Sequence, residues 1–340
     1  MHMADALLSP AVGAAMWTAT AATTVYCAKR LREEPDPARV PLMGVVGAFV
    51  FAAQMINFTI PGTGSSGHLG GGLILAILLG PEAAFLVMAS VLTVQALFFA
   101  DGGLLALGAN IFNLGFFPAF VAYPFIFRPI AGRDPSAARL AVASVIAAVV
   151  GLQLGALGVV LETTLSGVSA LPLVPFAAVM LPIHLAIGLV EGLVTAAVVV
   201  FVSRAQPEIL ARRSAGEGLG GVATRSVIAA LGLAAVVAGV FLSLFASASP
   251  DGLEWSIANV AGAPELEAAG PVYEWAAALQ ERLAFLPDYS LGASESAAGT
   301  SVSGVVGAAI TLALVAGVGA LLAWRARRRD SGAGPADGDG

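Results

Sequence analysis

Residues 174–202 read VPFAAVMLPIHLAIGLVEGLVTAAVVVFV, a run of 29 residues in which the only charged side chain is Glu191. A helix of about 20 apolar residues is long enough to cross the hydrocarbon core of a bilayer. The whole chain has the same character, because 58% of its 340 residues are hydrophobic and only 11% are charged. Its mean hydropathy is +0.89. Soluble domains carry about 25% charged residues, so the sequence predicts an all-α polytopic membrane protein.

Eight further apolar runs accompany this one, and together they predict nine membrane spans. Seven runs lie at 7–28, 41–60, 69–80, 82–100, 104–127, 139–161 and 174–202, and two follow at 226–246 and 303–324. The run 69–80 is too short to cross about 30 Å of hydrocarbon as an upright helix. We therefore expect irregular backbone near residues 61–72. Such backbone survives at membrane depth only where protein or a water-lined cavity satisfies its hydrogen bonds.

The basic residues orient these spans, because cytoplasmic loops of membrane proteins are enriched in Lys and Arg. With the N-terminus outside, 15 of the 16 Lys and Arg residues fall on the cytoplasmic side, and only Arg282 falls outside. The sequence therefore predicts a multi-pass protein of the cell membrane with an outer N-terminus and a cytoplasmic C-terminus. The first span is expected to stay in the mature protein. Asp5 precedes it and Lys29 and Arg30 follow it, the reverse of a cleavable signal peptide.

The spacing of the runs divides the chain into parts. The expected parts are a seven-span bundle (1–213), a Gly-rich cytoplasmic linker (214–225), a module of two spans (226–329) and a tail (330–340). In the third part, the two spans flank an acidic outer segment, 248–302, with a short amphipathic helix around 271–285. The tail is rich in Gly and Asp and is expected to be disordered.

Composition also excludes several classes of function. The net charge of −6 argues against a nucleic-acid partner, which requires a basic face. A single cysteine, Cys27, excludes an internal disulfide and a thiolate metal cluster. The sequence has no Gly-rich phosphate loop with its lysine, so ATP hydrolysis is not expected of this chain. We expect a protein that lies in membrane lipid and is not an enzyme.

The N-terminus offers an unusual group of nitrogen donors. The amine of Met1, the amide nitrogen of His2 and the Nδ1 atom of the His2 imidazole can close two fused chelate rings around one ion. A fourth nitrogen completes a square-planar site, a geometry diagnostic of Ni(II) or Cu(II). His68 lies in PGTGSSGHLGGG (61–72) on the same expected side of the membrane, and imidazole is the commonest metal ligand. Met1, His2 and His68 are therefore the candidate metal ligands.

Other polar residues in or near the spans are candidates for supporting partners that orient the ligands. They are Asp5, Asn57, Gln95, Asp101, Asn110, Asn113, His184 and Glu191. Asp101 and the two glycines after it are expected to form a tight outer turn, and the amides to hydrogen-bond between helices. His184 and Glu191 lie on one helical face. A structural His–Glu pair and a supporting role at the site are both open for these two residues.

Two other functions remain open at this stage. GTGSSGH (62–68) places Ser65 and Ser66 near His68, and an intramembrane serine hydrolase requires a serine near a histidine base. Fluorophosphonate labelling that is lost in Ser66→Ala would support it. The chain could instead be an accessory membrane protein with no ligand of its own. Neighbouring genes for a coupling protein and ATPases would count against that alternative.

Three stretches together resemble the CbiM/NikM family, the substrate-binding membrane components of energy-coupling-factor (ECF) transporters for cobalt and nickel. They are MHMADALLSP (1–10), INFTIPGTGSSGHLGGGLILAILLGPEAAFLVM (56–88) and VQALFFADGGLLALGANIFNLGF (94–116). The similarity covers residues 1–205. Further along, SASPDGLEW (247–255) resembles the PDGLE domain, which is related to the small CbiN/NikN partner subunit.

The resemblance implies a fold, a site and partners. The fold is the seven-span bundle of an ECF substrate-binding component, followed by two C-terminal helices. The cargo, Co(II) for cobalamin synthesis or Ni(II) for nickel enzymes, is held by the Met1 amine, the His2 amide and imidazole, and the His68 imidazole; no catalytic cofactor is implied. The partners are a transmembrane coupling protein and two cytoplasmic ATPases. The family's usual aromatic residue after the first acid is replaced here by Ala6-Leu7, which could loosen the packing of the terminal loop.

Overall fold

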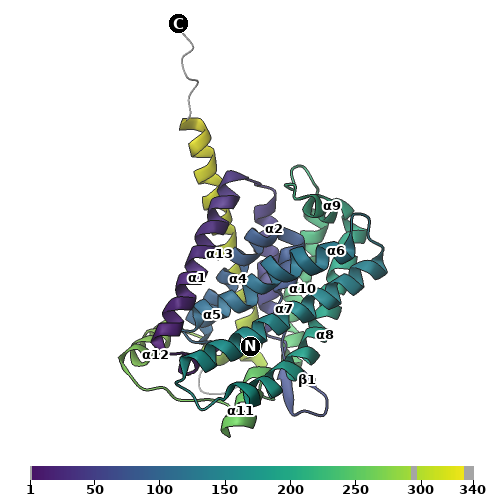
Figure 1. The fold of residues 1–340 in the computed structure, drawn as a ribbon. Coiled ribbons are helices and arrows are strands. Elements are labelled where there is room, and N and C mark those ends of the chain that lie inside the picture. The colour runs from purple at the N-terminus through teal and green to yellow at the C-terminus, as the bar shows by residue number, and fades with distance from the viewer. Residues whose placement is uncertain (1, 292–296, 333–340) are drawn as a thin grey trace.

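The computed structural model describes residues 2–291 and 297–332, and it is mostly helical (Figure 1). The elements up to residue 131 are η1 (Asp5–Leu7), α1 (Pro10–Glu33), α2 (Arg39–Gln54), β1 (Phe58–Ile60), β2 (Ser65–Gly67), α3 (Gly72–Leu79), α4 (Pro81–Phe99), α5 (Leu107–Ile111), the π-helix η2 (Phe112–Phe127) and α6 (Arg128–Ala131). They are followed by α7 (Ala137–Ser166), α8 (Leu173–Ala205), α9 (Pro207–Ala215), α10 (Arg225–Val240), η3 (Leu242–Phe245), α11 (Gly252–Ala261), α12 (Pro271–Leu283), η4 (Pro287–Tyr289) and α13 (Ala297–Gly332). The helical fold is confirmed, but the antiparallel β1–β2 hairpin was not predicted.

Five helices in the described part are long and apolar enough to cross a membrane, judged by length and composition. They are α4, the continuous stretch Leu107–Ala131, α7, α8 and the part of α13 from Gly299 to Ala326. The nine expected spans are therefore matched in part. α2 and α10 have only 16 residues each. α1 has 24 residues but contains four threonines, which make it less apolar.

The run 69–80 becomes a short buried helix that does not form a span of its own. α3 has eight residues, all buried, and is therefore about 12 Å long. Residues 68–71 lead into it without regular structure from the β1–β2 hairpin. Gly72 is required at the start of α3, because a Cβ there would lie 2.4 Å from the carbonyl oxygen of Leu114 in η2. The irregular backbone predicted within 61–72 is confirmed, but a seventh regular span in the first part is not formed by this run.

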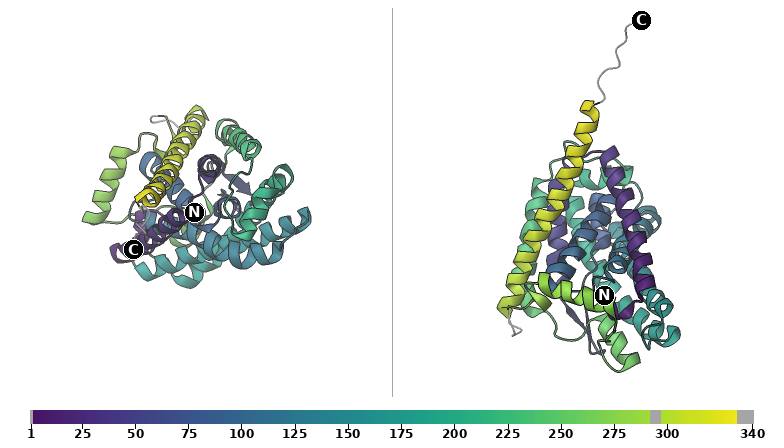
Figure 2. Two further views of the ribbon diagram at one scale, coloured as in Figure 1. Left: turned by 90° about the horizontal axis from the view of Figure 1, so that it is seen from above. Right: turned by 90° about the vertical axis from the view of Figure 1, so that its left-hand side faces the viewer.

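The C-terminal helices pack around α2. Both α10 and α13 contact it, and α13 also contacts α1 and α4. Most residues of α2 are buried. Figure 2 shows α13 running along the whole bundle and extending past it toward the C-terminus. A short helix such as α2 is therefore shielded on several sides by longer ones, and the two modules form one packed body.

The linker expected at 214–225 is packed against one end of this body. α9 includes its first two residues, and the amide of Leu219 donates a hydrogen bond to Oδ2 of Asp36 at 2.6 Å. Asp36 also lies 3.5 Å from Arg39 and 3.5 Å from Arg213. The Gly-rich stretch is thus held by the loop between α1 and α2.

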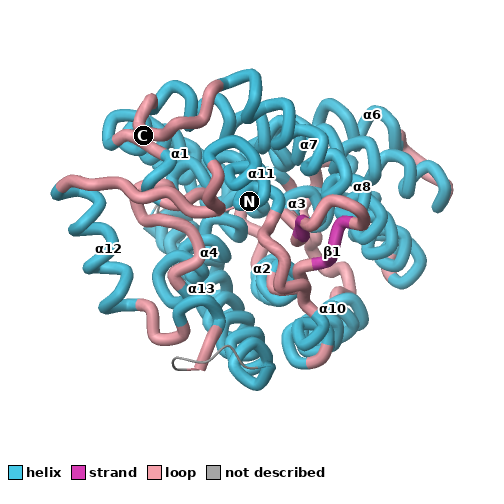
Figure 3. The backbone as a smooth tube through the Cα atoms, turned by 90° about the horizontal axis from the view of Figure 1, so that it is seen from below, coloured by secondary structure: helices cyan, strands magenta, loops and turns pink. Residues whose placement is uncertain are grey.

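The expected outer segment, 248–302, folds back over the opposite end of the bundle, where the N-terminal residues lie. It contains α11 and α12, and α12 confirms the helix predicted around 271–285. Figure 3, seen along the bundle from this end, shows α11 near the middle and α12 at the side. Residues 292–296 of this segment lie outside the described residues, as do 333–340 of the tail. The first three residues of the expected tail belong to α13.

Candidate metal-binding site

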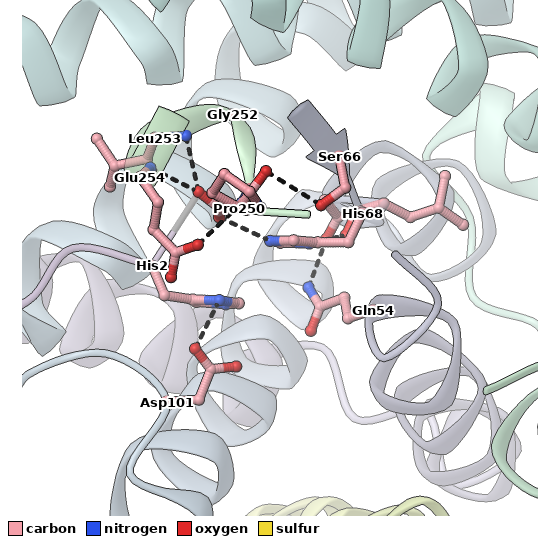
Figure 4. A network of polar contacts seen from close by, with 12 residues as sticks. His2, Gln54, Ser66, His68, Asp101, Pro250, Gly252, Leu253 and Glu254 are labelled. Atoms are coloured by element: carbon pink, nitrogen blue, oxygen red, sulfur yellow. Dashed lines mark hydrogen bonds and ion pairs between the residues drawn. The ribbon is translucent and has the colours of Figure 1, made fainter. Parts of the chain in front are cut away.

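His2 and His68 meet at the end of the bundle that holds the N-terminal residues. Their rings are parallel within 2° and their centroids are 5.0 Å apart. Figure 4 shows the two side chains next to each other. Each side chain is only 8% exposed. Both line an open cavity of about 980 Å³, together with Asp101, Asp251 and Glu254. Two of the three candidate ligands are therefore brought together from segments that lie far apart in sequence.

The segment that carries His2 is fixed through its neighbour, Met3. The side chain of Asn110 accepts a hydrogen bond from the Met3 amide at 2.8 Å and donates one to the Met3 carbonyl at 3.1 Å. The amide of Gly103 donates to the same carbonyl at 2.9 Å. Gly102 makes this close approach possible, because its φ is +82° and a Cβ there would lie 2.9 Å from Nδ2 of Asn110. These contacts leave the backbone at His2 little freedom.

The His2 ring is held by side chains from both modules. Its Nδ1 lies 3.1 Å from Oδ1 of Asp101, and the hydroxyl of Tyr289 donates to Oδ2 of the same carboxylate at 2.5 Å. The Tyr289 ring stacks on Phe99 with centroids 4.9 Å apart. Burial acts to raise the pKa of Asp101. The charge of His2 and the two hydrogen bonds outweigh it and hold that pKa well below its ordinary value, so Asp101 is an anion beside the site.

Nδ1 of His2, the ring nitrogen that the chelate hypothesis uses, lies against Asp101. In the chelate, Nδ1 faces the ion, whereas here it faces Asp101. Nε2 is buried and has no hydrogen-bond partner among the described residues. Ligation through Nδ1 therefore requires the imidazole to turn about its Cβ–Cγ bond. A buried polar atom without a partner costs about 1–3 kcal/mol, which marks this ring as a place where a ligand is favoured.

His68 presents one nitrogen to the cavity. Its Nδ1 lies 3.1 Å from the carbonyl oxygen of Leu69, which can only accept, so Nδ1 carries the proton. The other nitrogen, Nε2, then has a lone pair and lies 3.7 Å from Oδ2 of Asp251. Burial lowers the pKa of His68 and favours the neutral ring. A neutral imidazole whose second nitrogen is fixed by a carbonyl is the usual arrangement of a metal-binding histidine.

The irregular segment after His68 is satisfied by a buried carboxylate. Glu191 of α8 accepts hydrogen bonds from the amide of Gly70 at 3.1 Å and from the amide of Gly71 at 3.0 Å. A Cβ on Gly70 would lie 3.0 Å from the same carboxylate, so glycine lets the carboxylate approach closely. Non-helical backbone at membrane depth requires such partners. Glu191 therefore supports the loop that carries His68.

Two glutamines complete this support. Gln54 donates to the carbonyl of Gly70 at 2.8 Å, and Gln95 donates to Oε1 of Gln54 at 2.9 Å. His184 lines a small pocket next to the site, together with His68 and Asp251, and its Nδ1 lies 2.8 Å from the carbonyl oxygen of Met180 one turn earlier in α8. The His184–Glu191 pair that the sequence left open is not the arrangement observed. Each of these two side chains bonds to backbone groups.

The second module docks on the hairpin beside His68. The amide of Ser66 donates to the carbonyl of Pro250 at 2.8 Å, and the Ser66 hydroxyl donates to the carbonyl of Ser249 at 2.7 Å. The hydroxyl of Ser65 donates to the carbonyl of Ser66 at 3.1 Å. These serines therefore bind backbone carbonyls, and Ser66 connects the two modules.

Asp251 reaches the site from this docked segment, and sequence reasoning missed it. Its carboxylate caps α11 by accepting from the amides of Leu253 and Glu254, and Glu254 bonds back to the Asp251 amide. Burial acts to raise the pKa of Asp251, but its contacts with His68 help to hold that pKa well below the ordinary value. An acid followed three residues later by Glu is a sequence signature of a capped helix start. That signal predicts the helix, but not the contact with His68.

Three further candidates lie away from the two rings. Asp5 lines the cavity and accepts a hydrogen bond from a backbone amide just before α5 at 3.0 Å. Asn57 also lines the cavity, and its carbonyl accepts from the amide of Ser247 at 2.7 Å. Asn113 donates to Oε2 of Glu162 at 2.9 Å. Asn113 therefore belongs to a different pair between helices and does not support either histidine directly.

Met1, the third candidate ligand, lies outside the described residues. Within residues 2–291 and 297–332, no group of three or more His, Cys, Asp or Glu side chains is arranged to hold a metal ion. Two of the four expected donors, the Met1 amine and the His2 amide, are main-chain nitrogens and do not belong to any side-chain group. The side chains at the site are two imidazoles with one carboxylate beside each.

Comparison with known families identifies both modules. Residues 2–209 match the family described as cobalt uptake substrate-specific transmembrane region. Residues 225–324 match the PDGLE domain. Both matches agree with the resemblances seen in the sequence.

Individual relatives extend over both modules. A protein of Archaeoglobus fulgidus named as a fused nickel transport protein NikMN is 36% identical over 316 residues, which is 92% of this chain and 96% of the relative. A cobalt transport protein CbiM of Geobacter sulfurreducens is 31% identical over 252 residues, 72% of this chain and 71% of the relative. A crystal structure of a truncated transition metal transporter is 33% identical with a TM-score of 0.53, over 60% of this chain and 99% of the solved chain.

These matches decide between the functions that the sequence left open. The first family model covers more than half of the chain, and it describes a transport protein. The serine hydrolase alternative is therefore wrong, in agreement with the structural use of Ser65 and Ser66. The chain belongs to the family of cobalt uptake substrate-specific transmembrane regions, here joined to a PDGLE domain, and it is a multi-pass membrane component of transition-metal uptake.

Proposed function

We propose that this chain captures a Ni(II) or Co(II) ion at its outer end and delivers it into the cell as the substrate-binding component of an ECF transporter. The observation that carries the proposal is the parallel approach of His2 and His68, with Nδ1 of His68 committed to a carbonyl. Nε2 of His68, which faces the Asp251 carboxylate at 3.7 Å, is then the nitrogen that would bind an ion. The relatives named for nickel and for cobalt transport support the same cargo.

Four nitrogens hold the ion in this proposal. They are the Met1 amine, the His2 amide, Nδ1 of His2 and Nε2 of His68. On binding, the His2 ring turns and exchanges its contact with Asp101 for the ion. Asp101 and Asp251 then remain close by as two carboxylates. A dication in a poorly solvated site is favoured by nearby negative charge, so these acids support capture without being ligands themselves.

The choice between the two metals depends on geometry. Four nitrogens in a plane are typical of Ni(II), while the relatives include proteins named for each metal. Both ions are therefore candidate cargo. The two aspartates do not discriminate between them, because both ions carry the same charge.

The proposed topology has the N-terminus outside and the C-terminus in the cytoplasm of a cell membrane. The first module crosses seven times if α1, α2 and the partly irregular 68–79 stretch are included, and α10 and α13 cross twice more. The threonines of α1 are compatible with lipid, because Thr18, Thr23 and Thr24 each donate to the carbonyl four residues earlier. Hydroxyls satisfied in this way are tolerated in membrane helices.

Active uptake requires partners in this proposal. A transmembrane coupling protein and two cytoplasmic ATPases supply the energy, since the sequence has no phosphate-binding loop of its own. Membership in a metal-uptake family supports such partners. Transition-metal accumulation by cells that express the chain with and without these partners tests this part, with Ni(II) and Co(II) compared side by side.

The binding site is tested on the purified full-length protein in detergent. Three alanines added ahead of Met1 move the terminal amine far from the His2 amide, so that the terminal amine and the His2 imidazole can no longer share fused chelate rings. We expect a loss of Ni(II) and Co(II) affinity of at least about 100-fold in titration calorimetry, equivalent to about 2.7 kcal/mol. The matched control carries three extra alanines after Gly340. Unchanged affinity in the N-terminal variant would rule out the chelate.

A further inference from the structure

α12 has an apolar side that the bundle leaves uncovered. The side chains of Val272, Trp275 and Leu283 are 42%, 65% and 38% exposed. With the half-buried Leu279, they follow the spacing i, i+3, i+7 and i+11, which places all four on one side of a helix. An exposed apolar stripe of this kind is not expected to face water.

A second side of α12 attaches it to the bundle. Ala276 is buried there, at 1% exposure. The hydroxyl of Tyr273 donates to the carbonyl of Leu8 at 2.8 Å, and Gln280 donates to the carbonyl of Gly102 at 2.7 Å. These contacts fix the rotation of the helix about its axis. The apolar stripe therefore cannot turn inward to be covered by the bundle.

The third side of α12 is acidic. Glu274 and Glu281 are exposed, and helical spacing sets them roughly opposite the apolar stripe. Arg282, the one basic residue of the outer segment, lies beside the stripe next to Trp275 on the helical projection. α12 thus has three faces around its axis: one that packs on the bundle, one that is apolar and one that is acidic.

The position of α12 in the structure determines what each of its three faces contacts. Figure 2 and Figure 3 show it outside the group of bundle helices, and Figure 3, which looks along the bundle, shows α12 from its side. Its C-terminal end lies at the end of α4, where the amide of Leu286 donates to the carbonyl of Phe98 and the rings of Phe285 and Phe98 are 5.5 Å apart. α4 is one of the helices that are long and apolar enough to cross a membrane, so α12 lies across the bundle at the level where α4 ends.

We propose that α12 is an interfacial helix whose Val272–Trp275–Leu279–Leu283 face lies in the outer leaflet of the membrane. An amphipathic helix parallel to the surface buries its apolar side among the headgroups and the upper acyl chains. Trp is enriched at this level, and the exposed ring of Phe285 continues the same apolar surface toward α4. The acidic side then faces water, and Arg282 extends to the lipid phosphates. The occupant of the apolar face is lipid.

This placement connects the membrane surface to the rim of the cavity. Gln280 holds the Gly102 carbonyl, one residue from Asp101, and Tyr273 holds Leu8 just after the segment that carries His2. Lipid that fixes α12 therefore also fixes the loop that positions the His2 ring. α12 therefore supports the loops around the site but supplies no ligand to the ion.

Spin labelling of the full-length chain in vesicles of phosphatidylethanolamine and phosphatidylglycerol tests the proposal. In a Cys27→Ala background, a nitroxide is attached to Val272→Cys or Leu283→Cys on the apolar side, or to Glu281→Cys on the acidic side as the matched control. Relaxation by oxygen, which concentrates in lipid, is compared with relaxation by chromium(III) oxalate, which stays in water. We expect oxygen to dominate at the two apolar positions and chromium oxalate at position 281.

Two results would overturn the lipid assignment. Dominance of chromium oxalate at positions 272 and 283 would place the stripe in water. Protection from both reagents would mean that protein covers it, and dilution with unlabelled chain would show by loss of dipolar broadening whether that protein is a second copy. Metal titration of each labelled variant confirms that it is folded. The lipid assignment can fail while metal binding persists, so this test is independent of the proposed cargo.

Discussion

The two histidines are carried by irregular segments that are held in different ways. Residues 68–71 are fixed from inside the bundle, by Glu191 of α8 and Gln54 of α2. Residues 2–4 are fixed at the rim, by Asn110 and by the loop that contains Asp101. One support is built from side chains of α2 and α8, and the other from Asn110 of α5, the loop that contains Asp101 and the second module.

This difference separates folding from binding. If the Glu191 carboxylate is lost, the buried amides of Gly70 and Gly71 cannot form hydrogen bonds with water instead. Damage to the inner support therefore lowers the free energy of unfolding. The His2 ring and Asp101 line an open cavity of about 980 Å³, whereas Asn110 and Met3 behind them are buried. Because residues 2–4 form a short terminal segment outside the main helices, damage to this support is expected to let the His2 segment move, and the main cost then appears as metal affinity.

The largest effect is expected from Glu191→Ala. This change removes the acceptor of two buried amides, and a buried donor left without a partner costs about 1–3 kcal/mol. We expect the midpoint of thermal unfolding in detergent to fall by several degrees and the yield of folded protein to drop. Glu191→Gln keeps one acceptor oxygen and should lose less. If Glu191→Ala unfolds at the wild-type temperature, the inner support is not structural.

Asn110→Ala should have the next largest effect, and on a different quantity. It removes both hydrogen bonds to Met3 at the rim, which we expect to weaken Ni(II) or Co(II) binding roughly 10-fold to 100-fold, since about 1.4 kcal/mol corresponds to tenfold. Asn113→Ala is the matched control, because Asn113 bonds Glu162 instead. Calorimetric titration measures the affinity, and thermal unfolding of each variant checks that its stability equals that of the wild type. Equal losses in the two variants would contradict a specific role for Asn110.

Tyr289→Phe sharpens the comparison with a smaller change. The ring can still stack on Phe99, but the hydroxyl that donates to Asp101 is gone. We expect metal affinity to change by about 3-fold to 10-fold, as one hydrogen bond of about 0.5–1.5 kcal/mol predicts. Tyr273→Phe, which loses a bond to the Leu8 carbonyl and not to Asp101, should change it less. Identical affinities for Tyr289→Phe and the wild type would show that the hydroxyl does not position the carboxylate.

Much of this architecture follows from sequence because it depends on local pattern. Long apolar runs become helices, and the shortness of 69–80 correctly signals irregular backbone. The six glycines around His68 predict that the backbone approaches another part of the protein closely. In the structure it approaches the Glu191 carboxylate and η2. The predicted topology placed His2 and His68 on one side of the membrane, and the structure brings their rings together.

The contacts of the second module could not be predicted in the same way. Asp251 is one of many acids in the outer segment, and only its position against His68 distinguishes it. Tyr289 lies far from Asp101 in sequence. Its φ of +57° is uncommon for a residue other than glycine, so a tyrosine at this position does not predict that backbone conformation. Of the two roles left open for Glu191, the pair with His184 is not formed, because helical spacing shows which residues share a face but not which backbone groups lie opposite.

Having both modules on one chain changes what the docking of Ser66 on Pro250 must achieve. Separate subunits would have to offset the loss of translational and rotational freedom, about 4–15 kcal/mol, and a few hydrogen bonds cannot do so. On one chain the docking segment is present at an effective concentration on the order of millimolar, while α10 and α13 stay packed on α2. The segment can then leave and return without the modules separating. Covering the cavity therefore becomes a local equilibrium that does not depend on how much protein the membrane contains.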